Sequence, residues 1–264
     1  MRLRGRTERE GAARPPLELS LSPEFAALCE GPVELRRLEA PGSDAAGLGR
    51  LATQLASSAP EREIRVVLRG SLARLMLLPW VDQLTGESRW REFAASRFEQ
   101  TFGENLQDWD LQLASDWPGR DRLAAAWPAP VRAALDGCAN VTSVRLEILE
   151  HLAALLAREP AWTGCLAEIG ADGTMLVLVV RGRVGRARWR RSSDADGLAA
   201  VVRSEWAAVL DRARGDAASG DPVLAIVPPA PVEGSERAAA VERVAQAIGA
   251  RRILALSSLA GPAR

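Results

Sequence analysis

The stretch Cys165–Arg191, CLAEIGADGTMLVLVVRGRVGRARWRR, decides how the second half of this chain folds. The apolar run Trp162–Gly170 ends at the Asp-Gly turn Asp172-Gly173, and Thr174–Arg181 is a β-branched, apolar segment of strand length. Gly182 marks a second turn, after which Arg183–Arg191 alternates apolar and basic residues, as in a strand with one wet face. The stretch therefore predicts a meander of three antiparallel strands.

Alternating helices and strands follow this meander. Apolar residues recur at helical spacing from Leu198 to Leu210, and Asp194 or Asp196 can cap that helix. We expect a buried strand at Pro222–Val227, an amphipathic helix at Ser235–Ile248 that ends at Gly249, and a last strand at Ile253–Leu256. The predicted order is βββαβαβ.

The first half partly repeats this order and carries an extra unit. Its predicted strands are Leu17–Leu21, Val33–Leu38, Glu63–Leu68, Leu72–Leu77 and Val141–Leu146, and its predicted helices are Leu48–Leu55 and Ile148–Ala157. The extra unit consists of a helix at Trp90–Phe102, strands at Trp109–Leu113 and Leu123–Trp127, and a helix at Ala129–Leu135.

A βββαβ core that occurs twice, with a small α/β insertion in the first copy, resembles the duplicated RNase H-like (actin-like) fold. More narrowly, Val66–Trp80 (VVLRGSLARLMLLPW), the insertion through Leu135, and Cys165–Arg191 resemble the PilM-type actin-like proteins of type IV pilus assembly and the cytoplasmic domain of GspL-type proteins of type II secretion. The expected fold class is α/β, with two βββαβα-type lobes.

The expected division of the chain follows from this resemblance. Residues 1–16 are predicted to form a disordered tail, 17–158 the first lobe with an insertion near 81–137, and 159–264 the second lobe. The resemblance implies a cytoplasmic scaffold, peripheral to the inner membrane, that docks the tail of a bitopic membrane protein or an assembly ATPase. GspL-type proteins continue into a transmembrane helix, and the end at Arg264 makes the free-standing pilus type the nearer likeness.

Actin-like enzymes hold ATP with two hairpin phosphate loops and a glycine-rich adenosine loop, and each can be sought here. The first should lie near Leu17–Leu28, which has no glycine and contains Pro23, a residue without an N–H group. The adenosine loop is replaced by Pro228-Pro229-Ala230-Pro231.

The second phosphate loop matches better, because Glu168-Ile169-Gly170-Ala171-Asp172-Gly173-Thr174 resembles the family's Asp-x-Gly-x-x-x-Thr. If a nucleotide bound, its ligands there would be Glu168, Gly170, Asp172, Gly173 and Thr174, although the same residues also make an ordinary tight hairpin. Since two of the three loops fail, we predict no cofactor, and a nucleotide-binding regulator is the main alternative.

Other enzyme classes find little support. The chain has no Lys, one His and three Cys without a CxxC pair, which excludes a P-loop and disfavours a zinc site. We expect His151 to be a structural residue of a helix and the cysteines to be small apolar residues. A second alternative is an RNase H-like nuclease, with metal ligands among Glu18, Glu34, Glu168 and Asp172, but we predict no metal site.

Candidate partner-binding residues lie in two regions that are rich in Trp and Arg. They are Trp80, Trp90, Arg183, Arg186, Arg188 and Trp189. Trp and Arg are common interface anchors, although the tryptophans can equally anchor the core of the insertion and the arginines can form a solvated strand. Equal numbers of basic and acidic residues, 34 each, argue against a general nucleic-acid binder, and no apolar run is long enough to span a membrane. We therefore predict a non-catalytic scaffold.

Overall fold

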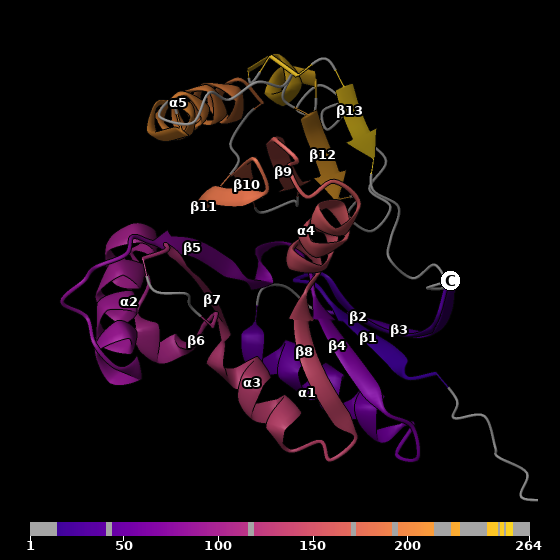
Figure 1. Ribbon diagram of the computed structural model, residues 1–264. Coiled ribbons are helices and arrows are strands. Elements are labelled where there is room, and N and C mark those ends of the chain that lie inside the picture. Colours follow the sequence, from indigo (N-terminus) through magenta and orange to yellow (C-terminus); the bar gives the residue numbers. More distant parts are fainter. Residues whose placement is uncertain are drawn as a thin grey trace, which may run out of the picture.

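The computed structural model describes residues 15–40, 44–115, 119–169, 173–191, 195–213, 223–227, 242–247, 249–250 and 252–255. These residues form two five-stranded mixed sheets and one three-stranded antiparallel sheet, with helices packed on them (Figure 1).

The first sheet has the strand order β3-β2-β1-β4-β8. Its strands are β1 (Leu17–Leu21), β2 (Phe25–Glu30), β3 (Val33–Glu39), β4 (Ile64–Leu68) and β8 (Val141–Leu146). β1 pairs antiparallel with β2 and parallel with β4, and β8 continues the sheet parallel to β4. The predicted strands Val33–Leu38 and Glu63–Leu68 are present within a residue of their expected bounds.

The second sheet repeats this order as β11-β10-β9-β12-β13. Its strands are β9 (Gly164–Ile169), β10 (Thr174–Val180), β11 (Arg183–Arg190), β12 (Val223–Val227) and β13 (Arg252–Ala255). The antiparallel and parallel pairings also repeat those of the first sheet. The duplicated, RNase H-like fold class predicted from the sequence is therefore confirmed.

Helices α1 (Ala45–Ser57) and α3 (Ala129–Asp136) lie side by side in the first lobe, and α4 (Glu147–Arg158) lies between the two sheets (Figure 1). α1 packs against β1, β2 and α3, while α4 leads from β8 into the second lobe. Asp44 caps α1 by accepting the backbone N–H groups of Ala46 and Gly47. In the second lobe α5 (Ala195–Ala213) packs against β10 and β11, and residues 242–247 are helical.

One hydrophobic core runs through both lobes. It includes Leu19 and Val66 of the first sheet and Leu166 and Val177 of the second, all of them fully buried. Leu75 of the insertion belongs to the same core. Because burial of apolar surface is the main stabilising contribution in folding, the lobes are held together by their interior as well as by polar contacts.

The insertion folds around a small sheet of its own with the strand order β5-β7-β6. Its elements are β5 (Arg74–Leu78), α2 (Glu87–Phe102), β6 (Trp109–Leu113), β7 (Arg122–Pro128) and the 3-10 turns η1 (Gly70–Leu72) and η2 (Leu106–Asp108). α2 buries Trp90, Ala94 and Phe98 against this sheet. The helical stripe read from the sequence thus forms the insertion core.

Two features of the first half differ from the sequence-based expectation. No strand was assigned to Phe25–Glu30, which is β2 and pairs with β1 around a tight turn at residues 22–24. The insertion was expected to start near residue 81, but β5 already belongs to its sheet. The expected tail, the Pro228–Pro231 loop and most of the predicted helix Ser235–Ile248 lie outside the described residues.

The two lobes offer a matched pair of glycines at equivalent hairpin turns. Gly31 and Gly182 both have positive φ, at 57° and 73°. A methyl group added at Gly31 would meet no atom within 4 Å, whereas one added at Gly182 would collide with the carbonyl oxygen of Pro160. We expect Gly31→Ala to lower the free energy of unfolding by about 1 kcal/mol, the cost of a left-handed conformation. Gly182→Ala should cost at least about 2 kcal/mol more.

Equilibrium denaturation with urea measures both values. Equal losses for the two variants would show that the backbone around Pro160 yields to the added methyl group.

Candidate functional site

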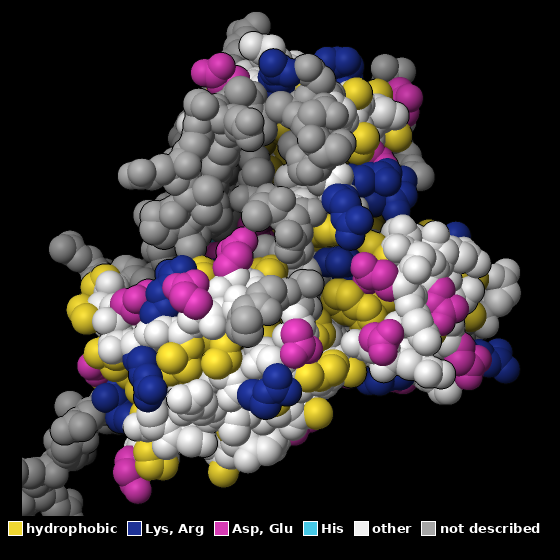
Figure 2. All heavy atoms as spheres, turned by 180° about the vertical axis from the view of Figure 1, so that it is seen from behind, with side chains coloured by type: hydrophobic (Ala, Val, Ile, Leu, Met, Phe, Trp, Pro, Cys, Tyr) yellow, Lys and Arg dark blue, Asp and Glu magenta, His cyan; other side chains and the backbone are white. Residues whose placement is uncertain are grey.

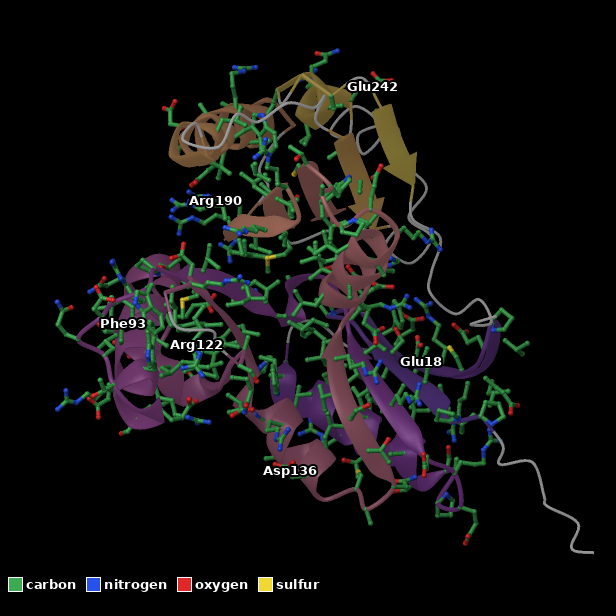
Figure 3. All side chains as sticks on the ribbon, in the orientation of Figure 1. Glu18, Phe93, Arg122, Asp136, Arg190 and Glu242 are labelled. Carbon is green, nitrogen blue, oxygen red and sulfur yellow. The ribbon has the colours of Figure 1, made fainter. Side chains whose placement is uncertain are left out.

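Charged side chains from four elements meet where the two lobes join. Glu18 comes from β1, Arg69 follows β4, Glu147 and His151 lie on the first turns of α4, and Glu168 lies near the end of β9. We call these five residues the interlobe cluster. Figure 3 marks Glu18 on the first sheet, on the side that faces the second lobe.

Arg69 is the cation of this cluster. Its Nη2 lies 3.3 Å from Oε1 of Glu147 and 3.6 Å from Oε1 of Glu18. Glu168 completes the connection between the lobes, because its Oε1 accepts the backbone N–H of Gly70, the residue after Arg69. One loop of the first lobe therefore binds carboxyl groups from both lobes.

Burial changes the proton affinities in this cluster. Glu147 and Glu168 are 4% and 5% exposed, and this burial, which Arg69 opposes only in part, raises their pKa values to about 8 and about 7. Burial also raises the pKa of Glu18 and lowers the pKa of His151. At neutral pH the cluster therefore retains protons that free carboxyl groups would have lost.

Several buried polar atoms in this region have no hydrogen-bond partner among the described residues. They are Oγ of Ser20, Nε of Arg69, Oε2 of Glu147 and Nε2 of His151. Leaving such atoms unpaired costs free energy, and where it persists it often marks a site that serves function rather than stability.

The first hairpin has no backbone donor left for a phosphate. Oγ of Ser22 accepts the N–H groups of Glu24 and Phe25, each at 3.2 Å, and the N–H of Ser22 binds the carbonyl of Phe25. Pro23, the remaining residue of the turn, has no N–H group. The turn that the resemblance assigns to phosphate binding therefore uses its own donors internally.

The second hairpin is only partly described. Gly170 and Asp172 lie outside the described residues, whereas Glu168 belongs to the interlobe cluster and Thr174 is fully buried. A Cβ at Gly173 would lie 2.5 Å from the carbonyl oxygen of Arg190 and 2.8 Å from Cζ2 of Trp189, so a glycine is needed there for close packing on β11.

The structure separates two of the four carboxyl groups considered for a nuclease, Glu18 and Glu34. Glu18 and Glu34 both pair with Cys29 across β2, so they lie two strands apart, about 10 Å by ordinary strand spacing. A shared metal ion pair requires about 4 Å. In the part of the chain that the structure describes, no group of three His, Cys, Asp or Glu residues is arranged to hold a metal ion. Asp172 lies outside that part.

The single histidine and the cysteines occupy ordinary structural places. His151 is 2% exposed on α4, and its Nε2 lies 4.0 Å from Oε1 of Glu147. Cys165 is fully buried, which raises the pKa of its thiol to about 12, far from that of a nucleophile. Cys29 and Cys138 are half-buried and buried thiols without a disulfide partner.

The proposed docking residues divide into buried and accessible ones. Trp90 is 3% exposed and packs against Trp80 at 5.5 Å, so it is a core residue and not a docking anchor. Trp80 is half-buried and donates its Nε1–H to Asp82. Arg183 is exposed at the start of β11.

Three arginines of β11 surround one carboxylate of α5. Arg186, Arg188 and Arg190 reach Glu205 at 2.6, 3.4 and 3.7 Å. Figure 3 shows Arg190 at the outer side of the second sheet, facing α5. These ion pairs connect α5 to the second sheet. Among the described residues one carboxylate pairs with three guanidinium groups, so the local charge is positive.

Arg74, for which the sequence predicts no role, joins the insertion to the second lobe. Its guanidinium lies 3.9 Å from the ring centre of Trp189 and 4.8 Å from that of Trp109, and it pairs with Glu104 at 2.9 Å. The signal that could have revealed it is an arginine within the otherwise apolar predicted strand Leu72–Leu77; in the structure this arginine begins β5.

Neither protein-family models nor curated proteins match this chain. Solved structures do match. A Bacteroides thetaiotaomicron protein described as having an actin-like ATPase fold and unknown function is 8% identical, with a TM-score of 0.58, 96% of this chain covered and 94% of the other. A PilM-PilN type IV pilus biogenesis complex is 15% identical, with a TM-score of 0.50 and coverages of 93% and 89%.

The cytoplasmic domain of EpsL, an inner-membrane component of the Vibrio cholerae type II secretion system, is 14% identical, with a TM-score of 0.45 and coverages of 88% and 94%. The likenesses to the first two structures show that this chain has the actin-like fold, and the set includes the pilus and secretion proteins that the sequence resembles. Among the described residues, no helix is long and apolar enough to cross a membrane.

The raised pKa values of the interlobe cluster predict how stability depends on pH. Both Glu147 and Glu168 bind their protons more tightly in the folded than in the unfolded chain, so their contribution is present at low pH and is lost as pH rises through about 7 to 8. Between pH 6.5 and 8.5 we expect the free energy of unfolding to fall by about 2 to 3 kcal/mol.

Glu147→Gln should remove most of this slope, because the amide cannot lose a proton, whereas Glu99→Gln at an exposed position of α2 should leave it unchanged. Urea denaturation at five pH values measures the slopes. A wild-type slope of zero would mean that the cluster is already ionised at pH 6.5.

Proposed function

We propose that this chain is a non-catalytic actin-like scaffold of a pilus or secretion assembly platform, which works at the cytoplasmic side of the inner membrane. In this proposal it binds the tail of a membrane assembly protein, with an assembly ATPase as a further partner. The observation that carries the non-catalytic part is the first hairpin turn, in which Ser22 occupies the backbone donors that a nucleotide phosphate would need.

The way the lobes are joined supports the same proposal. Actin-like enzymes bind their nucleotide between the lobes, whereas here the interlobe cluster and a shared hydrophobic core link the lobes directly. A scaffold benefits from this arrangement, because a surface that is already ordered pays less entropy when it binds a partner.

The likeness to the PilM-PilN complex supports a protein partner. That structure pairs an actin-like protein with a second pilus protein, and 93% of this chain matches it. A likeness at 15% identity indicates the fold alone. The class of partner is therefore inferred from the surface of this chain.

Basic and aromatic side chains gather beside the junction of β11 and the insertion. We define the basic-aromatic surface as Arg183, Arg186 and Arg188 of β11 together with the half-buried Trp189. Figure 2 shows dark blue side chains of the second lobe next to the insertion, with hydrophobic side chains beside them. The arginines exceed their one carboxylate partner, Glu205, so this surface favours a tail with acidic and apolar residues.

Binding of membrane-protein tails tests the docking part of the proposal. The probes are synthetic peptides with the cytoplasmic tail sequences of bitopic inner-membrane proteins encoded beside this chain, measured by calorimetry. We expect one tail to bind with a dissociation constant in the range of about 1 to 100 μM. Arg183→Glu should weaken it at least about tenfold, because it reverses a charge at the basic-aromatic surface.

Arg89→Glu, the same charge change at an exposed position of α2, is the matched control and should leave binding unchanged. Equal weakening by both variants would show that only overall charge matters, and absence of binding by every tail at about 0.5 mM would contradict the docking proposal.

Nucleotide addition tests the non-catalytic part. We expect about 5 mM Mg-ATP to leave the melting temperature of the full chain unchanged within 1 °C, since a ligand stabilises only a fold that binds it. Ser22→Gly frees two N–H groups in the first turn and serves as the comparison. A saturable rise in the melting temperature of the wild type would favour the nucleotide-binding alternative.

A further inference from the structure

The outer edge of the first sheet carries bare hydrophobic side chains. Val33 and Leu35, both on β3, are 57% and 51% exposed. The described residues include one other large hydrophobic side chain that is exposed, Ile253 on β13, at 45%. Two neighbouring apolar residues on an open sheet edge are unusual, because such edges attract other strands.

In the second lobe, the position equivalent to Leu35 is covered by a helix. β3 and β11 each contain a bulge at the same distance from their hairpin turn, and the extra residue is Leu35 in β3 and Gly185 in β11. A Cβ at Gly185 would lie 2.7 Å from Cγ1 of Val209, so α5 covers this bulge closely.

The first lobe lacks this cover. α1 has 13 residues against 19 in α5, and it packs on β1 and β2. Leu35 thus exposes an apolar side chain to solvent, whereas α5 covers the equivalent residue of the second lobe, Gly185. The fold itself therefore supplies no partner for this side chain among the described residues.

The charges beside Leu35 on one copy of the chain are complementary to those on a second copy. Glu34 precedes it and Arg36 follows it, and Glu34 also lies 3.8 Å from Arg37 of the same strand, an exposed contact of little strength. When two copies of β3 lie antiparallel with their Leu35 residues opposite each other, Glu34 of each copy faces Arg36 of the other. β11 offers the contrast, since it carries four arginines and no acidic residue, so two copies of β11 would repel.

We infer that β3 is a self-association surface through which two copies of this chain form a two-fold symmetric dimer. Leu35 packs on Leu35 at the symmetry axis, Val33 lies beside this contact, and two Glu34–Arg36 pairs flank it. The contact is isologous, because the same patch serves both copies. The bulge bends β3 and limits the length over which two strands can pair, so the dimer is weak and reversible.

Sedimentation velocity of the full chain over a concentration series tests this inference. We expect a monomer–dimer equilibrium with a dissociation constant of about 10 to 100 μM, as for a small interface. Leu35→Glu should weaken it at least about tenfold. Ile253→Glu, the same change at an exposed apolar residue elsewhere, should leave it unchanged.

A charge exchange tests the pairing itself. Glu34→Arg should weaken the dimer at least about tenfold, and the double variant Glu34→Arg/Arg36→Glu should restore it to within about threefold, because each copy then offers the same pairs in reverse. Far-UV circular dichroism checks that all variants are folded.

A wild type that stays monomeric up to about 0.5 mM would overturn the inference. So would loss of the dimer in Ile253→Glu, or failure of the double variant to restore what Glu34→Arg removes.

Discussion

The arrangement of the two lobes depends on the contacts of Arg69, whose guanidinium pairs with buried and half-buried carboxyl groups. Arg69 lies at the end of β4, directly before Gly70, and it faces carboxyl groups that burial would otherwise destabilise. The adjacent N–H of Gly70 binds Glu168 of the second lobe, so one short loop connects both halves. Burial, which this one cation offsets only in part, raises the pKa values of Glu147 and Glu168 to about 8 and about 7, so both retain protons near neutral pH that free carboxyl groups would have lost.

This polar junction works together with an apolar one. The hydrophobic core continues from the first sheet through β5 into the second sheet, and Arg74 stacks on Trp189 beside it. An actin-like enzyme needs lobes that close on a nucleotide, whereas lobes with a common core have little freedom to separate. The two junctions therefore favour lobes that move together as one body.

The duplicated fold uses its two halves differently. Their strand orders and bulges agree, but α5 covers the outer strand of the second sheet while α1 leaves the outer strand of the first sheet bare. β11 is rich in arginine and packs against β5 of the insertion, whereas β3 carries exposed apolar residues between charged ones. Gene duplication preserves the backbone pattern, while side chains at the edges are free to specialise for separate contacts.

Local patterns in the sequence determined most of the secondary structure and the duplication. The alternation of apolar and basic residues in Arg183–Arg191 has the period of a strand, and the apolar stripe of Trp90–Phe102 has the period of a helix. The strand Phe25–Glu30 is not predicted, because Pro23 and the likeness of Leu17–Leu28 to a phosphate loop favour a turn there. Its short apolar run also carries no clear alternation. The sequence also predicts the start of the insertion too late, near residue 81, although β5 already belongs to its sheet. The sheet that a strand joins depends on partners that are distant in sequence.

Tertiary structure alone decided the candidate site. Glu18, Arg69, Glu147 and Glu168 span 150 residues of sequence, and nothing in their local surroundings shows that they meet. The same holds for Trp90, whose burial removes it from any docking surface, and for Leu35, which is 51% exposed on β3. Periodicity is a property of neighbouring residues and is visible in the sequence. Burial, pKa and ion pairing depend on distances across the fold, and only the folded chain sets those.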